Sequence, residues 1–513
     1  MVLAAVVQVG RIVVKPAVRR ELVARPILSG VAIGTTLVVA AFWIGAVRRW
    51  PSLLLASGAV AGIGLIGFWW RARPDYGRQR GWPRGSLGNG ESFDAIESRT
   101  FYRDRAQRYG PIFKTSQFGR PVACLVGLGA ARELLHGHPA HLAGATLPYN
   151  RLIPKGTLRY MTPEDHRREA VAFRSAMTGV DLSAGERVVR DSCCRMLAAW
   201  ATASKPHGVG PLGHLRNWVD HALGVVFFGV EPADPMSAKL VAAQHALAID
   251  RMGEWGWSRR TEAAFEAATA LLRAVAGDRA GRPDQPTDSI LSGLLAAAPA
   301  ALDDPTRARN LFLAYRISTA DVAGLLDWVL AQLTDAPEWI RAVRAQSGTA
   351  GGPTGSQPTD LASRVVLETL RLEQSEYLYR RVTRPIELAG ATIPAGWLVR
   401  ICVQESHRDP AIYPNPDRFD PDRFLGRVFG RSEYSPFGAD NHGCLGAMVA
   451  LFLGRIFVEE LCHGYDWQLA QDGPPERGTR HRHHWRPSSQ RRFVLSRLAD
   501  AGWESTVAGP RVS

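Results

Sequence analysis

The chain has 513 residues and is 46% hydrophobic, so it can bury a large core, and its length alone favours more than one domain. Its formal net charge of +14 suits an anionic membrane surface or an acidic protein, whereas without any helix-turn-helix, finger or aromatic–basic strand pattern we expect no nucleic-acid partner. The six cysteines form no Cys-x-x-Cys pair, which indicates a reducing environment that faces the cytosol.

Two uncharged apolar runs lie near the N-terminus, at 27–47 and 52–70, and each is close to the roughly 20 residues that cross a bilayer. Basic residues precede the first run and follow the second, and only Arg48 and Arg49 lie between them. Because cytoplasmic flanks carry the excess positive charge, the sequence predicts a two-pass anchor in the cell membrane, with the following domain facing the cytoplasm. One true span with a re-entrant or interfacial helix is the alternative. A cleaved signal peptide fits poorly, since no small-residue cleavage site is followed by a secreted-looking domain.

Composition then divides the chain into a membrane anchor (1–71), a linker rich in Arg, Pro and Gly (72–92) and one large domain (93–513). Hydrophobic periodicity predicts that this domain is mainly α with small β sheets. The expected elements, in chain order, are a helix at 91–109, a hairpin of 112–118 with 122–126, helices at 130–136, from 162, 184–203, 218–228, 237–251, 260–276, 310–333 and 361–372, short strands between 386 and 399, a helix at 445–462 and a terminal hairpin within 463–513.

The helix that begins at Thr162 has a typical N-terminal sequence. Thr162 occupies the N-cap position, Pro163 the first helical position, and acidic residues the first turn. His166, Arg167 and Arg168 follow at once. This basic face either binds anionic groups inside the domain or docks an acidic electron donor.

Two separated segments carry residues that can form one ion-pair cluster. Glu368 and Arg371 lie three apart on a predicted helix, so they share a face and can pair. That spacing is common in proteins. Arg423, within the segment Pro-Asp-Arg-Phe at 421–424, supplies a second guanidinium that could bind the same carboxylate.

The segment 437–446 reads Phe-Gly-Ala-Asp-Asn-His-Gly-Cys-Leu-Gly and contains a single cysteine, Cys444. Its three glycines allow the backbone to pass close to a large planar group. An apolar helical run follows directly, and negative charge is favoured near a helix N-terminus. A thiolate held in this way suits an axial ligand of haem iron. A buried structural cysteine in a Gly-rich turn is the alternative.

Together, the cysteine loop, the Glu368–Arg371 pair and the Arg423 segment resemble the cytochrome P450 family, of a bacterial type behind a membrane anchor. The resemblance covers about residues 90–500. It implies haem b (iron protoporphyrin IX), with Cys444 as the axial iron ligand and Glu368, Arg371 and Arg423 as a structural triad. In the family an Arg follows one turn after His166, but Ala170 stands there, so Arg167 or Arg168 is left to supply the charge. The remaining cofactor-binding residues implied by the resemblance are His166, Arg380, Phe437, Gly438 and His442.

The predicted helix at 310–333 resembles the family's distal helix, which usually carries an acid followed directly by Thr. Such a pair delivers the protons that dioxygen needs before its O–O bond breaks. When the helix is aligned on Ala323, Ala320 falls at the acid position and Asp321 at the Thr position, and a shift by one residue does not restore the pair. A rearranged relay of Thr319 with Asp321 is one interpretation. The other is that Asp321 only neutralises a neighbouring arginine.

The resemblance implies a monooxygenase-type oxidoreductase that oxidises a lipophilic small molecule, of the kind made in secondary metabolism. Electrons would come from a separate ferredoxin and ferredoxin reductase, since the chain holds no flavin or iron–sulfur module. Because the distal acid–Thr pair is missing, peroxide-driven oxidation, radical coupling or a redox-neutral rearrangement is an alternative. A non-catalytic haem protein that binds or senses a ligand at the membrane is an alternative of another class.

Overall fold

The computed structural model describes Gly62 and residues 79–88, 91, 94–95, 98–117, 120–144, 158, 161, 163–247, 259–280, 289–298, 301–346, 360–373, 378–438, 443–477 and 485–498. The chain divides into two compact units, and the second, Gln79–Gly85 with Asp94–Ser513, contains almost all of the described residues. The predicted spans at 27–47 and 52–70 lie outside the described residues, apart from Gly62, and stay predictions. Within the described residues, every helix is too short or too polar to cross a bilayer.

Helices dominate the second unit, which confirms that the domain is mainly α with small β sheets. The helices are α6 (Phe101–Tyr109), α7 (Leu128–Gly137), α8 (Pro163–Thr178), α9 (Leu182–Ala203), α10 (Pro211–Phe228), α11 (Pro235–Ala246), α12 (Arg259–Ala280), α13 (Ile290–Ala297), α14 (Pro305–Asp335), α15 (Pro337–Ala345), α16 (Leu361–Leu372), α17 (Val403–Ser406) and α18 (Ala447–Gly464). The short helices α13, α15 and α17 have no counterpart in the prediction.

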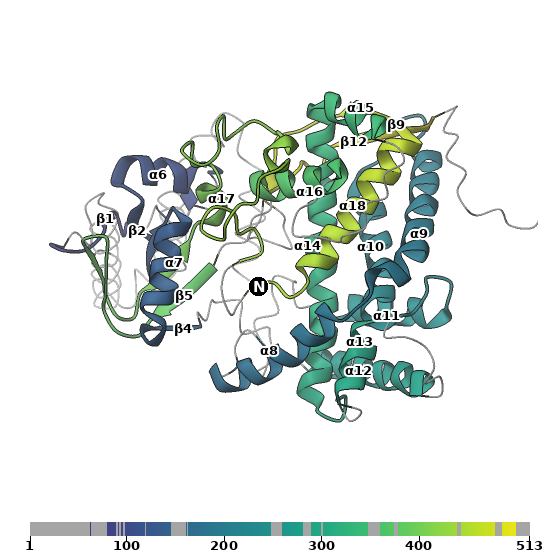
Figure 1. Cartoon of the computed structure of the whole chain (residues 1–513), viewed down its shortest axis with the longest axis horizontal. Coiled ribbons are helices and arrows are strands. Elements are labelled where there is room, and N and C mark those ends of the chain that lie inside the picture. The colour runs from purple at the N-terminus through teal and green to yellow at the C-terminus, as the bar shows by residue number, and fades with distance from the viewer. Residues whose placement is uncertain are drawn as a thin grey trace, which may run out of the picture. The chain divides into compact units, whose positions relative to one another are not determined.

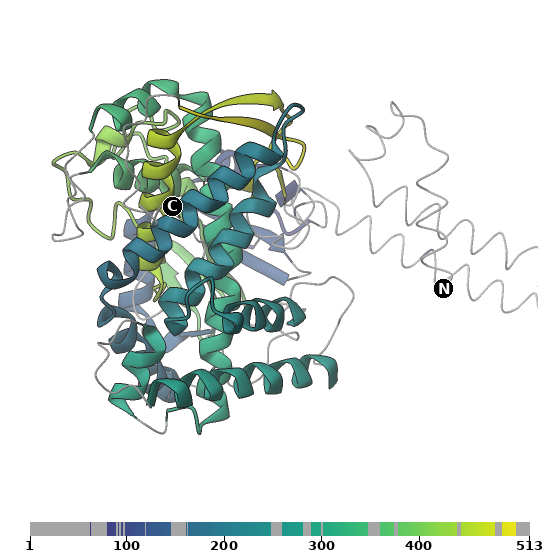
Figure 2. The same cartoon turned by 90° about the vertical axis from the view of Figure 1, so that its right-hand side faces the viewer.

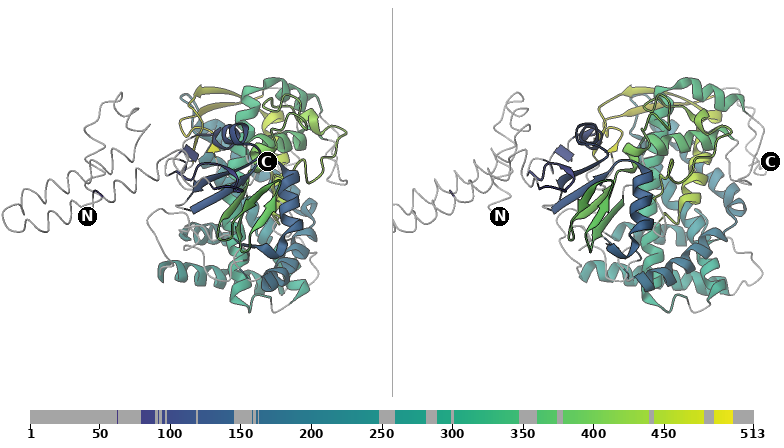
Figure 3. Two further views of the ribbon diagram at one scale, coloured as in Figure 1. Left: turned by 90° about the vertical axis from the view of Figure 1, so that its left-hand side faces the viewer. Right: turned by 60° about the vertical axis from the view of Figure 1, so that its left-hand side comes forward.

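Strands from the two ends of the domain form one six-stranded sheet of order β1-β2-β3-β8-β5-β4. Its members are β1 (Arg84–Gly85), β2 (Ile112–Gln117), β3 (Arg120–Leu125), β4 (Leu142–Gly144), β5 (Leu378–Val382) and β8 (Leu398–Ile401). The predicted hairpin is confirmed, because β2 and β3 pair antiparallel from Ile112 opposite Leu125. β3 also pairs in parallel with β8, so strands far apart in the sequence lie side by side (Figure 3).

Three further strand pairs are small. β6 (Ile386–Leu388) pairs with β7 (Ala391–Ile393), and β10 (Glu476–Arg477) pairs with β11 (Trp485–Arg486). The C-terminal part of the described chain forms an antiparallel pair of β9 (Tyr465–Gln471) with β12 (Arg492–Arg497), drawn in yellow in Figure 2. This pair confirms the predicted terminal hairpin.

Several predicted helix boundaries were wrong, among them the start of α10, which lies at Pro211 and not at 218. The helix expected at 91–109 is interrupted, and α6 begins only after Thr100, whose Oγ1 donates to Asp104 Oδ2 over 2.8 Å. α14 begins five residues earlier than predicted, because Asp304 accepts a hydrogen bond from the backbone N–H of Thr306 at 2.8 Å and Pro305 occupies the first position. α11 ends at Ala246 instead of 251.

α14 is the central helix of the domain, and its 31 residues span about 46 Å at 1.5 Å per residue. Helices α10, α12, α16 and α18 all pack against it (Figure 1). Most of its side chains are therefore buried, but Ile317 is 45% exposed and Asp321, one turn later, is also exposed. Ile317 and Asp321 thus form an exposed stripe, the open stripe, in the middle of α14, where the other side chains are buried or half-buried.

The contact of α16 with α18 is unusually close. A Cβ atom added to Gly454 of α18 would lie 2.8 Å from Cγ2 of Val366 on α16, so only glycine allows this approach. α16 carries the predicted ion pair, and α18 follows directly after the cysteine loop. The close contact therefore fixes the two parts of the candidate site relative to each other.

Candidate active site

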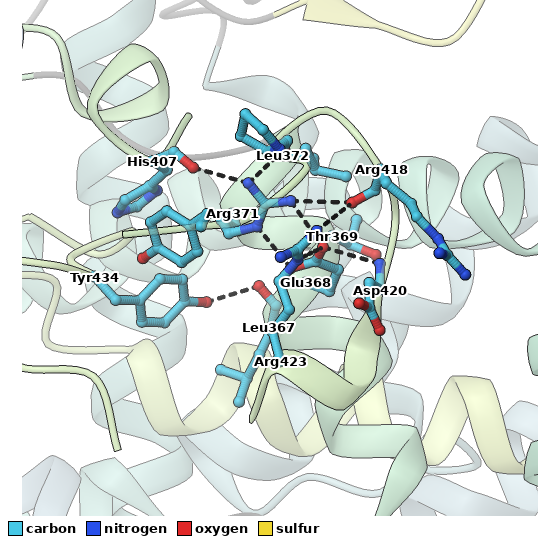
Figure 4. Close-up of polar contacts among 12 residues, drawn as sticks. Leu367, Glu368, Thr369, Arg371, Leu372, His407, Arg418, Asp420, Arg423 and Tyr434 are labelled. Atoms are coloured by element: carbon cyan, nitrogen blue, oxygen red, sulfur yellow. Dashed lines mark hydrogen bonds and ion pairs between the residues drawn. The ribbon is translucent and has the colours of Figure 1, made fainter. Parts of the chain in front are cut away.

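The predicted triad of Glu368, Arg371 and Arg423 is assembled in the core. Arg371 donates from Nε to Glu368 Oε2 at 2.7 Å and from Nη2 to Oε1 at 2.8 Å, and both side chains are fully buried. Arg423 donates from Nε to Glu368 Oε1 at 3.2 Å, and the backbone N–H of Asp420 reaches the same oxygen at 2.9 Å (Figure 4). Burial raises the pKa of Glu368 above its ordinary value, although the guanidiniums of Arg371 and Arg423 lower it. A carboxylate so surrounded by donors can remain charged in the core.

The same two arginines hold the irregular chain that precedes the cysteine loop. Arg371 Nη1 donates to the carbonyl oxygens of His407 at 2.8 Å and Pro416 at 2.7 Å. Arg423 Nη2 donates to the carbonyl of Asn415 at 2.8 Å. Because these carbonyls belong to a segment without regular secondary structure, the guanidiniums replace the hydrogen bonds that a helix or sheet would provide.

Cys444 lies in a loop that is closed by its own backbone. The N–H of Cys444 donates to the carbonyl of Phe437 at 2.7 Å, and Gly438 adopts a φ of +84°, which favours glycine. Cys444 is exposed, whereas Cys124, Cys193, Cys402 and Cys462 are buried. The alternative of a buried structural cysteine is therefore wrong. The sulfur is presented three residues before α18, near the positive end of that helix.

Phe437 is half-buried and packs against the main core, which anchors the start of the loop. His442, which the resemblance gave as a cofactor-binding residue, lies outside the described residues, as do its neighbours 439–441. Its role stays a prediction.

His166 on α8 and Arg380 on β5 are brought close enough to interact electrostatically. Burial lowers the pKa of His166, and the charges of Arg174 and Arg380 lower it further. Arg168 instead forms an exposed ion pair with Asp165, with Nη2 2.8 Å from Oδ1. Among the arginines of α8, Arg174 is thus the one whose charge acts on His166, whereas Arg167 and Arg168 were the residues predicted for that role.

The structure does not bring the Thr319 hydroxyl and the Asp321 carboxylate onto one face of α14. Two residues along a helix are about 200° apart around its axis. Thr319 is buried, and its Oγ1 donates to the carbonyl of Tyr315 at 3.4 Å, while Asp321 is exposed and Ala320 is buried. Asp321 therefore stands on the open stripe with Ile317, apart from that hydroxyl.

Asp327 is a buried carboxyl on α14 that the sequence reasoning missed. Burial raises the pKa of Asp327 to about 7, although the nearby charges of Arg486, Arg491 and Arg216 lower it. Arg491 is itself engaged elsewhere, since its Nε donates to Asp472 Oδ1 at 2.8 Å. An aspartate in an apolar helical stretch was the signal, but only tertiary packing shows that it is buried.

Asp327→Asn is expected to stabilise the chain more at pH 8 than at pH 5, by on the order of 2 kcal/mol. The carboxyl titrates near 3.8 when unfolded and near 7 when folded. Between these two pH values the folded chain holds a proton that the unfolded chain has lost. Wild-type stability therefore falls as the pH rises from 3.8 to about 7, and it levels off above that. Denaturant unfolding at both pH values measures the difference. The control is Asp335→Asn on the same helix, whose side chain is 67% exposed; equal pH responses of the two variants would contradict the prediction.

The described residues fit a flat anionic cofactor that carries a metal. An exposed thiol provides a soft metal ligand, Arg174 and Arg380 provide positive charge for carboxylates, and the neutral His166 ring can donate a hydrogen bond to them. The open stripe at Ile317 and Asp321 leaves one face of α14 uncovered by protein. Among the described residues, no cluster of His, Cys, Asp and Glu suits a metal ion held by protein alone. The exposed thiol and the nearby positive charge are the features that a haem bound through a cysteine thiolate requires.

Comparisons with known proteins indicate the same kind of site. The family model for Cytochrome P450 matches residues 319–489. Abscisic acid 8'-hydroxylase 2 of Oryza sativa subsp. indica is 27% identical over 424 residues, which are 76% of this chain and 80% of that protein. A protein named cytochrome P450 135B1 in Mycobacterium bovis is 34% identical over 233 residues, 44% of this chain and 47% of that protein.

Solved structures share the fold. A retinoic acid-bound cyanobacterial cytochrome P450, CYP120A1, has a TM-score of 0.62 at 22% identity, with 80% of this chain and 96% of that chain covered. A zebrafish cytochrome P450 with abiraterone has a TM-score of 0.60 at 18% identity, with 77% and 98% covered.

The family model and the relatives thus relate the chain to the cytochrome P450 family, and the solved structures share its fold. This family implies a haem cofactor, small-molecule substrates and redox partners. Its related hydroxylases are monooxygenases, so the chain is an enzyme of that oxidoreductase class. The relatives thereby favour an enzyme over the non-catalytic haem protein.

Proposed function

We propose that the chain is a cytochrome P450 that oxidises a lipophilic small molecule, of the kind made in secondary metabolism, with dioxygen and electrons from a separate ferredoxin-type donor. One observation carries the proposal: the Cys444 thiol is exposed in a loop closed by the Cys444 N–H and the Phe437 carbonyl at 2.7 Å. A thiol that served only packing would be buried, as four of the other described cysteines are.

The haem that we propose is haem b, and Cys444 would be its protein ligand to iron. When bound, it supplies the activation of dioxygen, for which a thiolate ligand favours O–O cleavage. His166, Arg174 and Arg380 would hold its carboxylates, since the charges of both arginines act on the His166 ring. His442 is proposed to assist them. Phe437 and Gly438 would shape the backbone of the loop that carries Cys444.

The electron donor that we propose is acidic. Arg167 and Arg168 are exposed on α8, the helix that also carries His166, and the whole chain has a formal net charge of +14. Complementary charge speeds the encounter of two proteins and orients it. Such a donor would bind less tightly as the salt concentration rises.

The membrane location is also a proposal. The apolar runs 27–47 and 52–70, with arginines on both outer flanks, support a two-pass anchor in the cell membrane and a catalytic domain facing the cytoplasm. A lipophilic substrate could then reach the enzyme from the bilayer. The name of the abscisic acid hydroxylase, which is 27% identical, is in keeping with a lipophilic substrate.

A second candidate is chemistry that does not need the usual proton delivery, such as peroxide-driven oxidation, radical coupling or a redox-neutral rearrangement. The observation in its favour is that the Thr319 hydroxyl is buried against the Tyr315 carbonyl while Asp321 lies on another side of α14. Under this candidate, protons would come from water or from the substrate.

Turnover of the purified full-length chain separates the two candidates. Lipophilic metabolites are first screened for those that shift the absorption spectrum of the haem-loaded protein. Each of these is then incubated with NADPH and a surrogate ferredoxin system, or with peroxide alone. Product coupled to NADPH consumption supports the leading proposal, product with peroxide alone supports the second, and a chain that binds no haem overturns both.

A further inference from the structure

The side chain of His407 lies between the buried triad and the turn that leads to Cys444. The residue is fully buried. Its ring stacks on Tyr434, with centroids 5.1 Å apart and an interplanar angle of 28°, and it meets the edge of Tyr413 at 6.3 Å and 74°. His407 and Tyr434 are seen beside Arg371 in Figure 4. Two aromatic rings therefore fix the orientation of the imidazole.

One nitrogen of this ring bonds the turn itself. The backbone N–H of Ser435 donates to Nε2 of His407 at 2.9 Å in a buried position. The ring also hydrogen-bonds the backbone of Arg371, and the carbonyl of His407 accepts from Arg371 Nη1 at 2.8 Å. His407 is thus bonded on one side to the helix of the triad and on the other to Ser435.

From Ser435 the contacts continue to the cysteine. Ser435 Oγ donates to the carbonyl of Gly438 at 2.7 Å, and the Gly438 N–H donates to the Ser435 carbonyl at 3.2 Å. The next residue back, Phe437, accepts from the N–H of Cys444 at 2.7 Å. An unbroken series of hydrogen bonds and short peptide segments therefore links Arg371 to the thiol.

The same turn also borders a pocket. Ser435 and Gly438 line this pocket together with the exposed side chains of Arg132, His136 and Arg431. The hydrogen bond from Ser435 to His407 therefore ties a pocket wall to the core.

The ring keeps an acceptor lone pair over the range in which proteins function. Burial lowers the pKa of His407 to about 3, and the charges of Arg371 and Arg408 act in the same direction. A neutral ring donates through one nitrogen and accepts through the other, as these two bonds require. The group that faces Ser435 is therefore an acceptor and not a cation.

We propose that His407 is a positioning residue: its ring joins the backbone of Arg371 to the N–H of Ser435 and so holds the Cys444 loop in the geometry that binds the cofactor. This inference rests on the proposed function for the role of Cys444. His407 touches neither the cofactor nor the reacting atoms, and it acts only through the turn.

The test compares three variants of the full chain. His407→Phe keeps an aromatic ring on Tyr434 but offers no acceptor to Ser435, whereas His407→Gln can accept from Ser435 and donate to the Arg371 carbonyl. Tyr434→Phe is the matched control, because it removes a buried hydrogen bond of the same cluster, from the Tyr434 hydroxyl to the Leu367 carbonyl at 2.8 Å, without touching Ser435. His407→Leu takes the place of His407→Phe if the latter does not fold.

Two measurements are made on each variant. Hydrogen–deuterium exchange of the peptide around Ser435 in the haem-free chain is expected to speed up about tenfold in His407→Phe, the factor that corresponds to one lost buried hydrogen bond. In the reduced, haem-loaded chain with carbon monoxide, the same variant is expected to lose the red-shifted Soret band in favour of an unshifted one. His407→Gln is expected to restore both readouts, and Tyr434→Phe to leave both unchanged.

Wild-type exchange and an undiminished shifted band in His407→Phe would overturn the inference and leave the proposed function standing. An equal effect of Tyr434→Phe would also overturn it, because the loss of any buried hydrogen bond of this cluster would then loosen the turn, and the bond from His407 to Ser435 would have no special role. If the wild-type chain itself shows no shifted band, the proposed function fails, and the exchange measurement in the haem-free chain still decides whether His407 holds the turn.

Discussion

Arg371→Met is expected to lower the free energy of unfolding by about 3–5 kcal/mol, because it leaves the fully buried carboxylate of Glu368 with only part of its compensating charge. The variant also removes the donors that bind the carbonyls of His407 and Pro416. Both effects act on the segment that leads to the cysteine loop. Denaturant unfolding of the purified chain measures the loss.

Arg418→Met is the matched control for this experiment. Arg418 belongs to the same irregular segment, but its side chain is exposed, and it is the Arg418 carbonyl that accepts from Arg371 Nη2 at 3.2 Å. Its substitution is expected to change stability by no more than about 0.5 kcal/mol. Equal losses in the two variants would mean that the buried ion pair is not what holds this segment.

Cys444→Ala is expected to abolish the red-shifted Soret band that the reduced chain shows with carbon monoxide, together with all product formation. The reason is that the proposed iron ligand is removed from an exposed position at the end of a preformed loop. Since the Cys444 side chain is exposed, the stability of the haem-free chain is expected to change by less than about 0.5 kcal/mol. Difference spectra and denaturant unfolding of the same preparations check both statements.

Cys194→Ala provides the comparison. Cys194 is only half-buried and lies on α9, where its sulfur is 2.9 Å from Glu460 Oε2. This variant is expected to keep the shifted band. An unchanged spectrum for Cys444→Ala would show that the iron ligand lies elsewhere, and the proposed function would then be wrong.

Much of the helical architecture could be predicted because its signals are local. The helix predicted at 361–372 is α16 residue for residue, and Asp360 accepts from the Ser363 N–H at 2.6 Å at its start. The pairing of Glu368 with Arg371 followed from helical spacing, which the α16 backbone alone enforces. The start of α14 was missed although Asp304 and Pro305 are a typical N-cap and first-position pair, because the apolar periodicity begins only at Asn310.

The wider site could be predicted only where a resemblance supplied what spacing could not. Glu368 and Arg423 lie on separate segments, so their 3.2 Å contact was expected from the family pattern and not from local geometry. Arg167 or Arg168 was predicted to act beside His166, but the charges that act on its ring come from Arg174 and from Arg380 of a distant strand, which spacing along α8 could not show. The buried state of Asp327 was not foreseen at all.

By itself, the sequence determined where helices form, which pairs share a helical face, and that one cysteine lies in a glycine-rich loop before an apolar helix. These features depend on neighbours within a few residues, whose relative positions the helix repeat dictates. Only the tertiary structure decided that the Cys444 thiol is exposed, that Thr319 is buried while Asp321 is exposed, and that the His407 ring accepts a hydrogen bond from Ser435. Burial and long-range hydrogen bonds depend on how distant segments pack, and packing at atomic separations is a property of the whole fold.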